Sequence, residues 1–123
     1  MRALFLLVTL LSFQNATAQK KYALIVAVGT YMPGSNIASI ASLNDIKYIK
    51  AVLKNNGFIP ANIATLENAK ATKAGILLSL DGVAKKAAAG DVVLLHFSMH
   101  GQQIRDQREG LGKDEDDGYD EAL

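Results

Sequence analysis

The stretch YALIVAVG at residues 22–29 is apolar or aromatic at every position before its glycine. An alternating pattern would indicate a strand with one solvated face. A continuous run bounded by Lys20-Lys21 and Gly29 is instead typical of a strand that is covered on both faces. Such strands occur in parallel sheets with helices packed on either side, so this stretch predicts an α/β domain built around residues 22–29.

The segments that follow change to helical spacing and back. Apolar residues at 43–53 recur every three or four positions, and Gly57 is expected to be the left-handed cap that ends this helix. Residues 62–66 read as a short second strand. Thr72 is the predicted N-cap of a second helix, whose apolar stripe consists of Ile76, Leu77, Leu80, Val83, Ala84 and Ala87.

A third strand is predicted at residues 92–97, after Gly90-Asp91. Strand, helix, strand, helix and strand in this order, joined by right-handed crossovers, give a mostly parallel sheet with helices on both faces. Ligands and catalytic groups of such sheets lie outside the carboxyl ends of the strands. The segments expected there are 29–31, 67–68 and 98–101.

His100 is the candidate catalytic residue, because it follows a buried strand and precedes a glycine. A neutral imidazole there can act as a general base, since its ordinary pKa lies close to physiological pH. The position alone equally allows a structural histidine that is capped by a backbone carbonyl. His96, inside the strand, is interpreted as a core residue. The chain has no cysteine, so it holds no thiol nucleophile.

The first residues are typical of an export signal. Met1-Arg2 gives a positive start, residues 3–13 are almost entirely apolar, and Ala16-Thr17-Ala18 has the small-x-small pattern of a signal-peptidase site. We therefore expect residues 1–18 to be a cleaved signal peptide and residues 19–123 to be one domain, exported to the periplasm or the extracellular space. An uncleaved membrane anchor is less favoured, because no stop-transfer flank follows the apolar run. Once the signal peptide is cleaved, no stable membrane span is expected.

Charge is unevenly distributed along the chain. Residues 19–105 carry 10 Lys/Arg against 4 Asp/Glu, whereas residues 106–123 carry 2 against 8. The lysines are scattered along predicted helix faces, so a nucleic-acid partner is not expected. The acidic stretch 114–121 is either a Ca²⁺ site or a solvated turn. It does not fit the EF-hand pattern, because Lys113 would occupy the first ligand position.

Four motifs appear in a fixed order: YALIVAVGTY at 22–31, LNDI at 43–46, HFSMHG at 96–101 and DEDDGYDEAL at 114–123. Together they resemble the caspase-like cysteine peptidases, and among these the metacaspases and their bacterial relatives. The resemblance covers essentially all of residues 21–123. It implies a caspase-like three-layer sandwich, of which this sequence would supply the part up to the third strand.

The resemblance also implies a role for each matching residue. His100 would be the catalytic histidine, and Gly101 would lie beside the oxyanion region. Asp45 and Ser98 would line the pocket for the substrate residue before the scissile bond, which in metacaspases is acidic and accepts Arg or Lys. Asp120 would be one of several Ca²⁺ ligands, so Ca²⁺ is the one cofactor implied. The partner would be a protein or peptide substrate.

Two features depart from the family pattern. Met99 stands where the family usually has glycine, and the cysteine nucleophile, in an Asp-x-Cys-x-x-Gly segment after the next strand, is not reached by Leu123. We interpret the chain as the N-terminal part of a cysteine endopeptidase with a Cys-His dyad, inactive by itself. The alternatives are a catalytically inactive caspase-like module for protein binding or assembly and, more remotely, a secreted Ca²⁺-binding α/β domain.

Overall fold

A computed structural model describes residues 19–105 and 119–122 of the chain. Three parallel strands form a sheet in the order β2-β1-β3, and β4 and β5 form a separate antiparallel pair. The mostly parallel α/β architecture predicted from the sequence is thereby confirmed. The elements are β1 (Lys21–Ala27), α1 (Leu43–Asn55), β2 (Ile63–Glu67), α2 (Lys73–Ala84), β3 (Val92–Ser98), β4 (Gln102–Arg105) and β5 (Tyr119–Ala122), with short 3-10 turns at Pro60–Asn62 and Asn68–Lys70.

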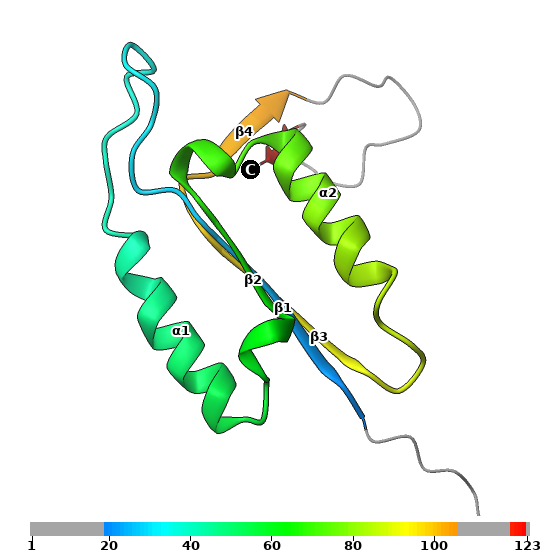
Figure 1. Cartoon of the computed structure of the whole chain (residues 1–123). Coiled ribbons are helices and arrows are strands. Elements are labelled where there is room, and N and C mark those ends of the chain that lie inside the picture. The colour runs from blue at the N-terminus through cyan, green and yellow to red at the C-terminus, as the bar shows by residue number, and fades with distance from the viewer. Residues whose placement is uncertain (1–18, 106–118, 123) are drawn as a thin grey trace, which may run out of the picture.

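The two helices cover opposite faces of the sheet, as Figure 1 shows with the sheet seen nearly edge-on. Alternation along β1 divides its side chains between two apolar clusters. One cluster joins Ala23, Ile25 and Ala27 to α1, and the other joins Tyr22, Leu24 and Val26 to α2. Residues 23–27 are 0% exposed, so the prediction of a strand covered on both faces is correct.

Both predicted helix caps are present. Gly57 has φ 79°, the Gly57 amide donates to the carbonyl of Lys54, and the Phe58 amide donates to that of Leu53. This is a Schellman motif, completed by the packing of Phe58 and Leu53 in the same cluster. At the other helix, Thr72 Oγ1 accepts a hydrogen bond of 3.0 Å from the Gly75 amide.

The second helix is shorter than its apolar stripe predicts. It ends at Ala84, although Ala87 still packs against the α2-side cluster. Gly75 near its start has a steric reason to be glycine, because a Cβ there would lie 2.6 Å from the Lys70 carbonyl oxygen. The apolar pattern is therefore only partly correct: Ile76, Leu80 and Val83 pack against the sheet, but Leu77 is 55% exposed, and the stripe runs one turn beyond the helix itself.

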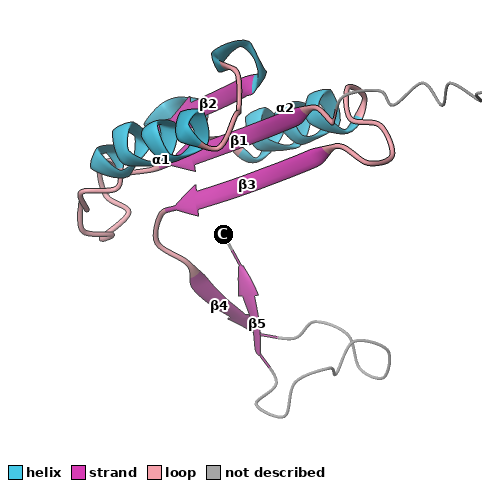
Figure 2. Ribbon diagram, turned by 90° about the horizontal axis from the view of Figure 1, so that it is seen from below, coloured by secondary structure: helices cyan, strands magenta, loops and turns pink. Residues whose placement is uncertain are grey.

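The β4–β5 hairpin was not predicted. It projects from the carboxyl end of β3, and its second strand, Tyr119–Ala122, includes the last three residues of the acidic stretch, which was predicted as a loop (Figure 2). Both strands are short and polar, so their pairing leaves no apolar periodicity in the sequence. The predicted signal peptide 1–18, the acidic residues 106–118 and Leu123 lie outside the described residues. Within the part described, no helix has the length and apolar character to cross a membrane.

Candidate active site

The three strand exits meet at one edge of the sheet, as predicted. Asn68, after β2, accepts hydrogen bonds at its Oδ1 from the amides of Gly29 (2.9 Å) and Thr30 (3.1 Å), which follow β1. Tyr31, in the same β1 exit, accepts a 2.7 Å hydrogen bond at its hydroxyl from the backbone amide of His100. We call this edge, formed by residues 28–31, 68 and 98–100, the rim of the sheet. Its contacts join residues 39 and 69 positions apart in sequence, so the sheet topology brings the rim together.

His100 is exposed at this rim, and its imidazole has a defined partner. Its Nε2 lies 3.1 Å from the carbonyl oxygen of Ala38, in the loop between β1 and α1. A carbonyl can only accept, so this contact is a hydrogen bond when Nε2 carries the proton. In the neutral ring the lone pair is then on Nδ1, which is the nitrogen that can take a proton.

The carbonyl contact is the one that a merely structural histidine would make. It is also compatible with catalysis, because it fixes the tautomer and leaves Nδ1 as the basic atom. The Ala38 carbonyl and Tyr31 are the two partners of His100 that the sequence did not reveal. A backbone carbonyl carries no sequence signal, and Tyr31 could have been suspected only from its place at the exit of the buried strand.

Asp45 and Ser98 are brought together from different elements. Asp45 lies in the first turn of α1, Ser98 ends β3, and the Ser98 hydroxyl donates a 2.6 Å hydrogen bond to Asp45 Oδ2. This length is typical of a bond to an ionised carboxylate. Among the described residues no lysine or arginine forms an ion pair with Asp45. The pair therefore presents a half-buried negative charge beside the rim, which suits a cationic group.

Ser42 is a polar neighbour of this pair that sequence reasoning missed. It is 4% exposed, and its hydroxyl has no hydrogen-bond partner among the described residues. The Ser-x-x-Asp spacing from Ser42 to Asp45 is the signal that could have drawn attention to it. Its backbone is helical (φ −52°, ψ −32°), so the hydroxyl does not act as an N-cap.

His96 and Met99 occupy opposite faces of the strand that carries the site. His96 is paired with Ile25 of β1, and its Nε2 is buried without a partner in the described residues. It is thus a packed residue, as predicted. Met99 packs against the α2-side cluster that includes Leu24 and Val26. The methionine that replaces the family's usual glycine therefore anchors the β3 exit on the α2 side of the sheet.

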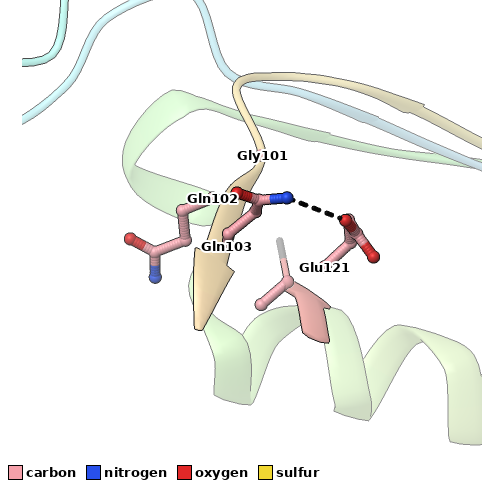
Figure 3. A pocket seen from close by; sticks show the side chains of 5 residues that line it. Gly101, Gln102, Gln103 and Glu121 are labelled. Atoms are coloured by element: carbon pink, nitrogen blue, oxygen red, sulfur yellow. Dashed lines mark hydrogen bonds between the residues drawn. The ribbon is translucent and has the colours of Figure 1, made fainter. Parts of the chain in front are cut away.

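Gly101 begins the surface that follows His100. A cavity of about 320 Å³ is lined by Gly101, Gln102, Gln103, Glu121 and Ala122. Figure 3 shows Gln103 reaching across the hairpin, where its Nε2 donates a 3.3 Å hydrogen bond to Glu121. The cavity therefore lies along the hairpin that follows His100 in the chain, and the role of Gly101 in an oxyanion site stays a prediction.

Asp120, the predicted Ca²⁺ ligand, is exposed on β5 opposite Ile104 of β4. The described residues contain no group of three or more His, Cys, Asp or Glu side chains that could hold a metal ion. Residues 114–117, the start of the acidic stretch that was predicted to be either a Ca²⁺ site or a solvated turn, lie outside the described residues. Binding of Ca²⁺ at Asp120 therefore stays a prediction.

Comparison with known proteins identifies the family of this fold and site. The caspase domain family matches residues 20–122, and the chain therefore belongs to this peptidase family. It is 32% identical to Metacaspase-1 of Candida albicans over 118 residues, which are 90% of this chain and 26% of that protein.

Two further relatives come from other organisms. Metacaspase III c of Phaeodactylum tricornutum is 39% identical over 84 residues (65% of this chain, 23% of the relative). Metacaspase-4 of Arabidopsis thaliana is 28% identical over 104 residues (80% and 24%). The chain thus spans about a quarter of the length of these relatives. The resemblance inferred from the four motifs is confirmed.

Proposed function

We propose that this chain is the N-terminal part of an exported cysteine endopeptidase, in which His100 serves a cysteine that lies outside residues 1–123. The observation that carries the proposal is the orientation of His100. Its Nε2 is held by the Ala38 carbonyl, and its Nδ1 is left as the base at the edge of the sheet where the strand exits meet. Membership of the caspase domain family supports the peptidase class.

The reaction would begin with transfer of the thiol proton to His100 Nδ1. The thiolate then attacks the substrate carbonyl, and backbone amides, including that of Gly101, stabilise the oxyanion. The imidazolium returns its proton to the leaving amine, and water hydrolyses the resulting thioester with His100 again as the base. The Nε2–H bond to Ala38 strengthens while the ring is charged, so the carbonyl stabilises the ion pair.

Specificity for Arg or Lys before the scissile bond would come from Asp45. Its carboxylate is oriented by Ser98 and has no ion-pair partner among the described residues, so a guanidinium or ammonium group can neutralise it. Asp120 would contribute to a Ca²⁺ site, and residues 1–18 would direct export. These finer assignments follow from the motifs and are open to direct test.

The first test is to determine the coding sequence beyond the codon for Leu123. An in-frame Asp-x-Cys segment supports the peptidase. A stop codon in its place would contradict it and favour the inactive module for binding or assembly. In parallel, the 123-residue chain should show no turnover of Arg- or Lys-ending peptides, because it has no cysteine. Thiol-dependent turnover by this chain would refute the need for a further cysteine.

The second test uses the complete gene product. His100→Ala should lower kcat by at least about 10²-fold, the lower range of general-base effects. Asp45→Asn should lower kcat/KM for Arg and Lys peptides by about 10-fold or more, with a smaller effect on peptides that lack a cation. Asp81→Asn is the matched control, because Asp81 is exposed and paired only locally with Lys85. Equal effects of the two Asn variants would exclude Asp45 from the specificity pocket.

The Ca²⁺ assignment is tested by calorimetry on the same product. Asp120→Ala should weaken Ca²⁺ binding, because one hard oxygen ligand is lost. Glu67→Ala serves as the control carboxylate, since Glu67 is exposed at the end of β2, which β1 separates from β3. Unchanged Ca²⁺ affinity in Asp120→Ala would remove Asp120 from the site.

A further inference from the structure

We propose that Tyr31 is the positioning residue of His100, holding the histidine backbone with its hydroxyl and the imidazole with its ring. This inference rests on the proposed function of His100 as the base. It concerns a residue that touches neither the substrate nor the nucleophile in the mechanism above. Three contacts carry it.

The first contact is the 2.7 Å hydrogen bond from the His100 amide to the Tyr31 hydroxyl oxygen. The second is the packing of the two rings, whose centroids lie 5.4 Å apart at an interplanar angle of 42°. The third is the bond of the imidazole Nε2 to Ala38, in the same β1–α1 loop as Tyr31. A single loop thus holds both the backbone and the side chain of His100.

Tyr31 is itself fixed to the sheet. Its hydroxyl donates a longer, 3.4 Å bond to the carbonyl of Val28, and the Val28 amide donates to the carbonyl of Ser98. The two residues before Tyr31 are held by the Asn68 side chain. Asn68 has φ 45°, an uncommon conformation for a residue with a side chain. Tyr31 therefore connects His100 to all three strands of the sheet.

The need for such a support follows from the local sequence. His100 is exposed and is followed by Gly101, which places few restrictions on the backbone. Ala38 can hold only the ring, whereas the direction of the side chain is set at the backbone. When the amide is bound to Tyr31 and the ring packs against it, fewer orientations of the imidazole compete with the one in which Nε2 is bound to Ala38.

The test is nuclear magnetic resonance on the full 123-residue chain with labelled histidine. Tyr31→Phe keeps the ring and removes the hydroxyl. We expect exchange of the His100 amide hydrogen to accelerate roughly two- to tenfold, the factor that one net hydrogen bond provides. We also expect the imidazole nitrogen shifts to move from a predominant Nε2–H tautomer toward a mixture. A residue that only supported the fold would not change the tautomer.

Tyr48→Phe is the matched control, since Tyr48 lies on α1 and is 61% exposed. Tyr31→Ala, which also removes the ring, should shift the tautomer further than Tyr31→Phe. If Tyr31→Ala does not fold, the Phe variant still decides the matter. The proposal would be overturned if the His100 amide exchanged at the same rate, and the His100 imidazole had the same tautomer ratio, in Tyr31→Phe as in Tyr48→Phe.

The outcome can be separated from that of the proposed function. Neither measurement requires a nucleophile, so a complete gene product without peptidase activity would leave the positioning of His100 intact. An active product whose Tyr31→Phe variant keeps the wild-type tautomer would refute the role of Tyr31 alone. In an active product we expect Tyr31→Phe to lower kcat more than it changes KM, because the hydroxyl acts on His100 in the proposed mechanism.

Discussion

Strands β1 and β3 are parallel neighbours of the same length, seven residues each, and are paired along their whole length. Their surroundings differ. β1 is covered by α1 on one face and by α2 on the other, whereas β3 is covered on its α1 side and exposes Val93 (43%) and Leu95 (48%) on its α2 side. Figure 2 shows β3 at the edge of the sheet, with the hairpin continuing from it.

The difference separates the part of the chain that stabilises the fold from the part that carries the chemistry. β1 holds the core by burial on both faces. β3 instead delivers Ser98 and His100 to the rim, where their positions depend on hydrogen bonds to Asp45 and Tyr31. Substitutions in β1 should therefore act on stability, and substitutions beyond the end of β3 should act on the geometry of the site.

The strongest test of this comparison uses two leucines that are paired across the strands. Leu24 of β1 is 0% exposed, and its partner Leu95 of β3 is 48% exposed. Leu24→Ala should lower the free energy of unfolding by about 2–5 kcal/mol, because it removes buried methyl groups and leaves a cavity. Leu95→Ala should cost less than about 1 kcal/mol. Equal losses in urea unfolding would break the comparison.

A smaller effect is expected in α2, the helix that covers β1 but leaves part of β3 uncovered. A Cβ at Gly75 would lie 2.6 Å from the Lys70 carbonyl oxygen, whereas one at Gly82 would meet nothing within 4 Å. Gly75→Ala should destabilise the fold by about 1–3 kcal/mol through this clash. Gly82→Ala should stabilise it by about 0.5–1 kcal/mol, since alanine favours helix. Thermal unfolding of the two variants checks both expectations. A change in melting temperature of the same sign in both would contradict the steric role assigned to Gly75.

The smallest effect is expected where β1 and β3 begin. Asp91 accepts hydrogen bonds from the amides of Ala88 and Lys20, and these bonds lower the pKa of its carboxyl group. Because the folded-state pKa is the lower one, the stabilisation is present above the unfolded pKa of about 3.9 and is lost as the pH falls through the folded value.

Asp91→Asn should therefore reduce the acid dependence of stability below about pH 4, while Asp81→Asn serves as an exposed control. Chemical unfolding measured between neutral and acid pH checks this expectation. If the stability of Asp91→Asn fell with pH as steeply as that of the wild type, the hydrogen bonds of ionised Asp91 to Lys20 and Ala88 would not be the cause of the acid dependence.

Much of the fold was predictable because its signals are local. The apolar run of β1, the glycine cap at Gly57 and the N-cap at Thr72 each act over a few residues. The β4–β5 hairpin was not predictable, since its pairing joins short polar strands across residues 106–118 and leaves no periodic pattern. The structure ends β1 at Ala27 and α2 at Ala84, although their apolar runs extend to Val28 and Ala87. The runs are longer because residues beyond the regular hydrogen bonding are still partly buried.

The sequence by itself determined the α/β class, the family and the identity of His100, Asp45 and Ser98 as site candidates, since apolar periodicity and motif order are properties of the chain. Only the tertiary structure decided which atoms meet. The pairing of Ser98 with Asp45, the hold of Ala38 on Nε2 and the contact of Tyr31 with His100 join residues 53 to 69 positions apart. Such contacts depend on the sheet order and on where each loop leaves its strand, and neither is encoded within a local stretch of sequence.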